Sequence, residues 1–299
     1  MQVAAEQRTI ATPASRAVAP PGHTNLRQLT ARYPRLVVFG AIIVLLVLIG
    51  IFAPLLAPYD PIQTAPTQVL QQPSPGHLLG TDNVGRDQFS RVIYGTRISL
   101  GVAVIAVTIA LSGGVLMGLA AGYIGGATDQ VLSRLIDAML AFPGVLLAIA
   151  VTSALGPSLR NAMIAVGIIQ IPLYFRLTRG QVLQAREHEF VTAAAVIGAS
   201  RLRILARHIM PNISNPLIVA ASISSSTSIL ALAALGFIGV GPQPPDPDWG
   251  SMINTASGAL GQAPWLSFGP GLAIFLTVFS FSMLGDALRD ALDPRLRIN

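Results

Sequence analysis

The 299-residue sequence contains no cysteine and, since all 19 of its basic residues are arginine, no lysine. Without cysteine the chain has no disulfide framework, no thiolate nucleophile and no zinc ribbon. Without lysine it cannot build the phosphate-binding loop of P-loop ATPases, in which a lysine contacts the phosphates. Any nucleotide hydrolysis linked to this chain is therefore expected on another chain.

Charged residues are also scarce, at 11% of the chain against roughly 25% in a typical soluble domain. Hydrophobic residues make up 52%, and the mean hydropathy is +0.63. This composition indicates a membrane protein. The net charge of +6 does not indicate a nucleic-acid partner, because the arginines are spaced among apolar runs and form no basic face with interleaved aromatic residues.

The first long apolar run covers residues 37–57. A helix of this length spans about 31 Å, which matches the hydrocarbon core of a bilayer. The apolar region of a cleaved signal peptide is shorter, roughly 7 to 15 residues, so the run predicts an uncleaved membrane anchor. Residues 1–36, rich in Pro, Ala, Thr and Arg, are typical of a disordered tail.

Five further apolar runs predict an all-α integral membrane protein with six transmembrane helices. Pro143 and Pro172 fall inside two of these runs. Neighbouring helices can satisfy the carbonyls that a proline frees, so we expect kinks rather than breaks. The five runs cover residues 98–124, 132–155, 161–179, 213–240 and 268–287.

The arginines predict the orientation of these spans. Six spans put both termini on one side, and that side carries 15 of the 19 arginines. The positive-inside rule places it in the cytoplasm, with the chain in the bacterial cytoplasmic membrane. The predicted organisation is a cytoplasmic tail (1–36), a first helix (37–57), an extracytoplasmic loop (58–96), a five-helix core (97–287) that includes a cytoplasmic loop (187–211), and a cytoplasmic C-terminal tail (288–299).

Within the second span, Gly114, Gly118 and Gly122 recur at every fourth position and therefore lie on one face of a helix. A stripe of small residues lets another helix approach closely. We expect this stripe to serve helix packing rather than chemistry.

The cytoplasmic loop predicts two short helices with a corner between them. Gly198 suits the left-handed position that ends the first helix, and Ser200 can cap the second by accepting a backbone N–H. The expected apolar faces are Phe190, Ala194 and Ile197 on the first helix and Leu202, Leu205 and Ile209 on the second, with Arg201, Arg203 and Arg207 on other faces.

Such an amphipathic element could lie in the membrane interface, in contact with lipid. Alternatively, it could dock into a groove of a cytoplasmic partner. A corner with fixed caps favours docking, because an interfacial helix needs no defined bend.

The same loop resembles a known motif. In the permease subunits of binding-protein-dependent ABC importers, the cytoplasmic loop carries Glu-Ala-Ala, three residues, Gly, nine residues and then Ile-x-Leu-Pro. The positions that match at the required spacing are Ala193, Ala194, Gly198 and Pro211, and Met210 replaces the Leu.

Two positions depart from the motif. Thr192 stands in place of Glu, which removes a carboxylate that could pair with a basic residue on the ATPase; Glu189, one turn earlier, could substitute for it. His208 stands in place of Ile, but "RHI.PN" is the usual form in the dipeptide and oligopeptide branch.

Four further segments resemble the C-type permease of the dipeptide, oligopeptide and nickel branch of these importers. They are LGTDNVGRDQFSRVIYGTRISLGVA from Leu79, GYIGGATDQVLSRLIDAMLAFPGVLLAI from Gly122, RLTRGQVLQAREHEFV from Arg176 and FLTVFSFSMLGDALRDALDPRLR from Phe275. The likeness covers residues 79–297 in the expected order.

The resemblance implies a type I ABC importer permease fold, paired with a second, homologous permease as a heterodimer. It also implies two ATPase subunits or domains, which bind ATP and Mg²⁺, and an extracytoplasmic solute-binding protein. This chain would itself bind no cofactor or metal and would not be an enzyme. ATP would close the ATPases, draw the docked corners together and switch the pathway between two states. The residues implied in coupling are Ala193, Ala194, Gly198, Ser200, Arg203 and Pro211.

Hydroxyl groups in the fifth span could line a pathway for a polar solute, and the candidates are Ser222, Ser225 and Ser226. The same hydroxyls could instead bond to carbonyls one turn earlier, or serve helix association.

The outer loops are expected to meet the binding protein. Asp246, Asp248 and Trp249 are the candidates, although Trp249 could instead anchor at lipid headgroups. Residues 80–87, GTDNVGRD, carry two glycines and three charges. Because this segment lacks lysine and lies outside the cytoplasm, a structural turn with internal Asp–Arg pairing is favoured over a phosphate cradle.

The leading interpretation is a subunit that imports di- and oligopeptides. The same branch carries nickel, glutathione and haem-type cargo, and the fold does not decide between them, because selectivity is expected in the binding protein. An ion-coupled secondary carrier would show inverted repeats and buried ionisable residues near the midplane, and neither is found in the sequence. A membrane anchor or sensor would leave the cytoplasmic corner unexplained.

Overall fold

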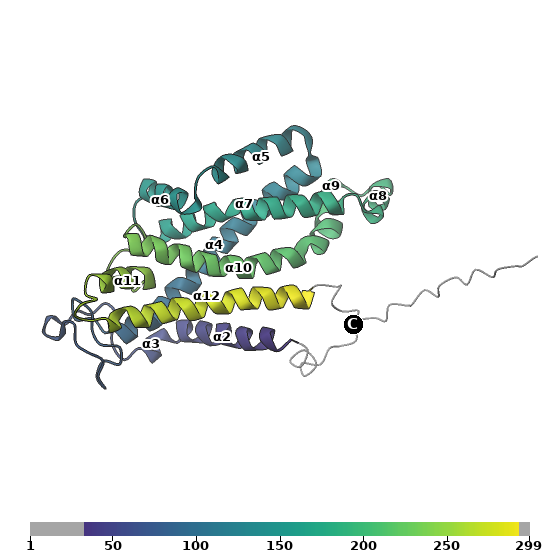
Figure 1. The fold of residues 1–299 in the computed structure, drawn as a ribbon. Helices are drawn as coiled ribbons and strands as arrows, with labels where there is room; N and C mark the ends of the chain where they lie inside the picture. Colours follow the sequence, from purple (N-terminus) through teal and green to yellow (C-terminus); the bar gives the residue numbers. More distant parts are fainter. Residues whose placement is uncertain (1–32, 293–299) are drawn as a thin grey trace, which may run out of the picture.

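The computed structural model describes residues 33–292, so most of the predicted N-terminal tail and residues 293–299 lie outside the described part. Within it, the regular elements are helical (Figure 1). The long helices are α2 (Pro34–Ile51), α4 (Gln88–Ile124), α7 (Leu159–Ala185), α10 (Met210–Ile238) and α12 (Trp265–Leu292). The shorter elements are α3 (Ala53–Leu56), η1 (Pro66–Gln68), α5 (Gly126–Leu140), α6 (Gly144–Leu155), α8 (Glu189–Val196), α9 (Arg201–Ile204), η2 (Leu205–Ile209) and α11 (Trp249–Ser257).

Five helices in residues 33–292 are long and apolar enough to cross a membrane, and α5 and α6 together supply the sixth run. The first span differs from the predicted 37–57, because it begins at Pro34 and ends at Ile51. Pro54, in the first turn of α3, has no N–H to continue the ladder of α2. The second span begins earlier than expected, at Gln88, where the side chain of Asp87 caps the helix.

The prediction for Pro143 is wrong. Helix α5 ends at Leu140, α6 starts at Gly144, and the two axes differ by 92°. Within residues 33–292, no neighbouring helix covers the bend, where Phe142 is 62% exposed. Pro172, by contrast, is buried inside a continuous α7, as predicted. The difference follows from packing, because helices around Pro172 stabilise the chain against the lost hydrogen bond.

Helices α4 and α7 pack closely along their length, and the glycine stripe allows this packing, as predicted. A β-carbon on Gly114 would lie 2.5 Å from Cβ of Tyr174, and one on Gly118 would lie 2.7 Å from Cβ of Thr178. Gly122 meets α7 in the same way. Side chains at these positions would force the two helices apart.

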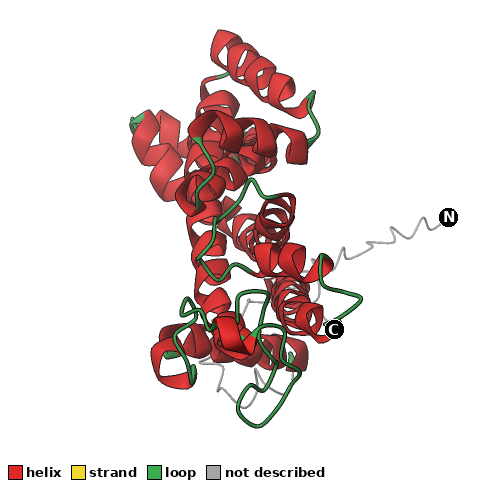
Figure 2. Ribbon diagram, turned by 90° about the vertical axis from the view of Figure 1, so that its left-hand side faces the viewer, coloured by secondary structure: helices red, strands yellow, loops and turns green. Residues whose placement is uncertain are grey.

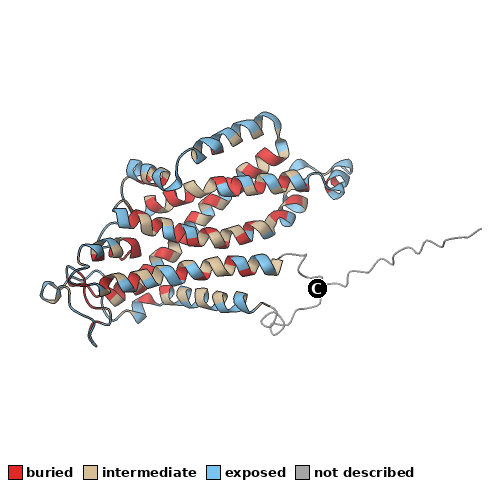
Figure 3. Ribbon diagram, viewed as in Figure 1, coloured by how far each residue is buried: buried red, intermediate tan, exposed pale blue. Residues whose placement is uncertain are grey.

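Helix α10 lies between α7 and α12, and α4 crosses diagonally behind these helices (Figure 1). Figure 2 shows the same elements turned by 90°. Burial follows this order, since red segments concentrate on α4, α7 and α10, whereas α2, α5 and α6 are mostly exposed (Figure 3). We call the end of the bundle that carries α8 and α9 the corner end, and the opposite end, with α3 and α11, the loop end.

At the loop end, residues 80–87 form the predicted structural turn. Arg86 donates to Asp82 at 2.7 Å, and Asp82 also accepts the backbone N–H groups of Val84 and Arg86. Asp87 accepts from Ser90 and contacts the ring of His77 at 2.8 Å. These carboxylates face inward and hold the loop closed, so the turn presents no open cradle of N–H groups.

Candidate functional site

Residues 189–204 form the corner that the sequence predicts. Helix α8 ends at Val196, and Gly198 adopts a left-handed φ of +82°. The N–H of Ala199 donates to the carbonyl of Ala194, and that of Gly198 to Ala195, which is the hydrogen-bond pattern of a Schellman cap. Ser200 then caps α9 by accepting the N–H of Arg203.

The second half of the corner differs from the prediction. Helix α9 does not end in a connection; it continues through the π-helical turn η2 into α10, so that residues 201–238 form one continuous helix. Pro211 lies in the first turn of α10. Because proline has no N–H to donate, it interrupts the regular ladder near the wide turn. The corner is therefore rigidly joined to a membrane span.

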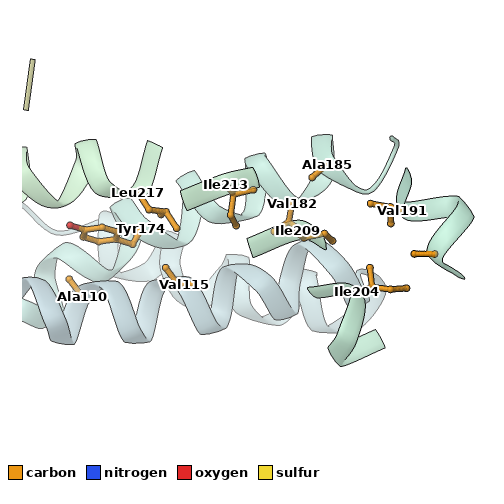
Figure 4. Packing of buried hydrophobic residues seen from close by; sticks show 11 residues of the cluster. Ala110, Val115, Tyr174, Val182, Ala185, Val191, Ile204, Ile209, Ile213 and Leu217 are labelled. Carbon is orange, nitrogen blue, oxygen red and sulfur yellow. The ribbon is translucent and has the colours of Figure 1, made fainter. Parts of the chain in front are cut away.

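The corner has two apolar surfaces, one buried and one exposed. Each of the two predicted apolar faces contains residues from both surfaces. One surface, which we call the root, is buried and consists of Val191, Ala194 and Ile204 of the corner together with Ile209 of η2. It packs in one cluster with Val182 and Ala185 of α7 and Ile213 of α10 (Figure 4). Of the predicted stripe on α8, only Ala194 is buried.

The other surface, which we call the tip, is exposed. It consists of Val196, Ile197 and Leu202, whose exposed fractions are 81%, 84% and 76%. Ala193, Gly198, Ser200, Arg203 and Pro211 are exposed as well. Arg201, Arg203 and Arg207 make no ion pair with any residue of the described range 33–292. The tip therefore combines apolar side chains with unpaired positive charge.

Two of the three serines predicted to line a pathway are buried between helices. Ser222 donates to the carbonyl of Phe281 in α12 at 3.0 Å, and Ser226 accepts from Ser282 at 3.1 Å. Ser225 is half-buried and donates back to Ala221. The hydroxyls of Ser222 and Ser226 join α10 to α12, which fits the alternative role in helix association.

A polar cluster between α7 and α10 is not evident from the sequence. The side-chain amide of Gln170 donates to Ser228 at 2.6 Å, and the hydroxyl of Thr227 lies 3.3 Å from the amide oxygen of Gln170. Thr227 is exposed and Gln170 is half-buried. The available signal was a single amide, Gln170, within the otherwise apolar run of residues 162–173.

Of the three candidates for contact with the binding protein, one is exposed and two are buried. Asp246 is exposed, but Asp248 and Trp249 are each 1% exposed. Asp248 caps α11 by accepting the N–H of Ser251, and burial raises the pKa of its carboxyl to about 6. The contact prediction is therefore wrong for Asp248 and Trp249, and the headgroup alternative fails for Trp249 for the same reason.

Comparison with known proteins agrees with this architecture. Residues 114–298 match the family described as binding-protein-dependent transport system inner membrane component. The chain belongs to this family, so it is a multi-pass inner-membrane permease and a transport subunit. Residues 32–73 match the N-terminal TM domain of oligopeptide transport permease C, which makes the chain a C-type permease within the family.

The curated relatives are similar over most of their length. The chain is 48% identical over 264 residues to the dipeptide transport system permease protein DppC of Alkalihalophilus pseudofirmus, covering 88% of this chain and 87% of that one. It is 46% identical over 265 residues to DppC of Haemophilus influenzae, covering 86% and 90%. It is 42% identical over 259 residues to the glutathione transport system permease protein GsiD of Pectobacterium atrosepticum, covering 86% of each chain.

Among solved structures, a chain of the MetNI methionine ABC transporter in inward-facing conformations matches with a TM-score of 0.54. The match covers 68% of this chain and 96% of that chain, at 16% identity. The likeness shows a shared ABC importer permease fold.

Proposed function

We propose that the chain forms one half of the membrane pathway of an ATP-driven importer of di- and oligopeptides, and that a related permease forms the other half. Relatives that are named for dipeptide transport support this cargo, and a relative that is named for glutathione, itself a peptide, fits the alternative. ATP and Mg²⁺ then bind to ATPase subunits, because this chain has no lysine for a P-loop. A solute-binding protein delivers the peptide from outside.

The corner end is the cytoplasmic side in this proposal. Six arginines lie between Arg176 and Arg207, at or near the corner, and Arg289 lies near the matching end of α12. The loop end has fewer arginines, and Arg86 and Arg91 there are buried. The positive-inside rule then places the tip in the cytoplasm, where an ATPase can reach it.

The exposed tip is the observation that carries the proposal. Helices α8 and α9 lie beyond the ends of α7 and α10, not alongside the spans (Figure 1). Three large apolar side chains at this point need a partner to leave water, and burying them contributes about 1.5–3 kcal/mol each. The unpaired arginines around them indicate a groove with an apolar floor and an acidic rim.

The root explains how such a partner moves the membrane helices. It fixes the corner to both α7 and α10, and the π turn makes α9 continuous with α10. Arg186, at the end of α7, also donates to the carbonyl of Gly122 at the end of α4. A displacement of the tip therefore acts on three membrane helices at once.

Charge substitution at the tip tests the proposal. Ile197→Asp puts an unpaired charge into the predicted apolar groove, so we expect it to abolish co-purification of the ATPase and ATP-dependent peptide uptake. Ala127→Asp, at the exposed start of α5, is the matched control and should retain both. Full ATPase binding and uptake by Ile197→Asp would contradict the proposal.

A further inference from the structure

A cavity opens on the side of the bundle between α7, α10 and α12. Its volume is about 590 Å³, and its walls include Leu173 and Leu177 of α7, Asn215 and Ile223 of α10, and Arg289 of α12. Asn215 and Arg289 lie near the corner ends of their helices, whereas Leu173 and Ile223 lie deepest in the bundle. The cavity therefore runs inward from the corner end and becomes apolar as it does so.

Gln170 and Thr227 lie one helical turn beyond this apolar wall. Gln170 precedes Leu173 by three residues, and Thr227 follows Ile223 by four, so each shares a helix face with a wall residue. Both residues are eleven positions from the loop end of their helix. At 1.5 Å per residue this is about 16 Å, close to the centre of a hydrocarbon core about 30 Å thick.

An exposed hydroxyl and a half-buried amide at this depth are unfavourable against lipid tails. Polar side chains inside a membrane protein mark solute pathways when they face water or a partner helix. Ser222 and Ser226, by contrast, are buried and hydrogen-bonded to α12. The α7–α10 face is therefore the polar surface of α10 that a translocated solute can reach.

The existing hydrogen bonds leave acceptor groups free. The amide N–H groups of Gln170 donate to Ser228 and, more weakly, to the carbonyl of Val166. The hydroxyl of Thr227 has one hydrogen, directed toward Gln170 or the carbonyl of Ser224. Lone pairs remain on the amide oxygen of Gln170 and on the hydroxyl oxygen of Thr227.

We propose that Gln170 and Thr227 form a binding station in the translocation pathway, where their free lone pairs accept hydrogen bonds from the ammonium and amide N–H groups of a peptide. Neutral acceptors suit this task, because they bind the backbone common to all peptides and release it readily. The proposal deepens the function proposed above and depends on it.

The test uses the complete importer, with its partner permease, ATPases and binding protein, in proteoliposomes. The probe is radiolabelled dialanine, measured alongside ATP hydrolysis stimulated by the binding protein. Gln170→Met and Thr227→Val keep side-chain volume but remove the acceptors. We expect each to lower uptake about five- to tenfold, the effect of one hydrogen bond of about 1 kcal/mol or more, with ATP hydrolysis within about twofold of wild type.

Two controls separate binding from structure. Ser228→Ala removes the buried partner of Gln170 without changing the exposed face, so it should transport like the parent protein. Thr227→Ser retains the hydroxyl, so its uptake should be well above that of Thr227→Val. Unchanged uptake by Gln170→Met and Thr227→Val overturns the inference. An equal loss in Ser228→Ala, or loss of the partner permease from Gln170→Met, also overturns it, because the pair would then be structural. If the wild-type importer moves no peptide, the proposed function itself fails.

Discussion

The indole N–H of Trp249 donates a 3.0 Å hydrogen bond to the carbonyl of Val92, 157 residues earlier in the chain. The ring lies against Gly95, where an added β-carbon would be 2.4 Å from the indole nitrogen. This contact fastens α11, near the end of α10, to the first turns of α4. A tryptophan that directly follows a Pro-rich loop is thus part of the folded core.

Substitution of Trp249 distinguishes a core residue from a surface one. We expect Trp249→Phe to lower the free energy of unfolding by about 1 kcal/mol through the lost hydrogen bond. Trp249→Ala should lower it by about 3–5 kcal/mol, because it leaves a cavity. Thermal unfolding in detergent measures both, and wild-type stability of Trp249→Ala would show that the ring is not packed as described.

The close packing of the glycine stripe predicts that alanine destabilises the protein at a packed glycine but not at an open one. Gly118→Ala places a methyl group 2.7 Å from Cβ of Thr178, so it should destabilise the α4–α7 pair by about 1–3 kcal/mol. Gly180→Ala meets nothing within 4 Å and should be neutral or stabilising by up to about 1 kcal/mol. Thermal unfolding in detergent again provides the readout, and equal effects of the two substitutions would refute close helix packing.

The left-handed φ of Gly198 predicts that transport depends on how well a substituted residue tolerates this backbone conformation. No heavy atom lies within 4 Å of a β-carbon built on Gly198, so any effect comes from its φ of +82°. Gly198→Asn should retain ATP-dependent uptake, since asparagine tolerates the left-handed region. Gly198→Val should lose uptake but still insert into the membrane, because a β-branched residue disfavours this φ. Wild-type uptake by Gly198→Val would remove the argument for a fixed corner.

Asp248 predicts a pH dependence of stability. Burial raises the pKa of its carboxyl from 3.8 to about 6 in the folded chain. The folded state then holds the proton more tightly than the unfolded state, so this group's contribution to the free energy of unfolding rises as the pH falls from 6 to 4. Asp248→Asn keeps a capping side chain without the charge. It should be more stable than wild type near pH 7, with a flatter profile between pH 4 and 6.

Chemical denaturation of the two proteins at several pH values measures this difference. A wild-type profile that stays parallel to that of Asp248→Asn across the interval would show that the carboxyl is not desolvated.

The features that sequence predicts well are local ones. Each span is an apolar run, and the corner is set by Gly198 and Ser200, whose hydrogen bonds stay within a few residues. The glycine stripe likewise follows from helical periodicity alone. In these cases, the residues that cause the structural feature are close together in the sequence.

The features that sequence misses depend on contacts between distant segments. Pro143 and Pro172 look alike in the sequence, and only packing makes one a break and the other part of a continuous helix. Ser222 and Gln170 both lie in apolar runs, but α12 covers the first and leaves the second accessible. Burial of Trp249 requires a partner more than 150 residues away.

The most direct test of the account asks what touches the tip. Because the chain has no cysteine, Ile197→Cys gives this subunit a single thiol, which can be cross-linked in the assembled importer. We predict that a short thiol-reactive cross-linker joins this position to the ATPase subunit, and that a thiol at Ala127, introduced by Ala127→Cys, gives no such product. Cross-linking to lipid alone, with the ATPase present but unlabelled, would contradict the claim that the corner transmits force from an ATPase.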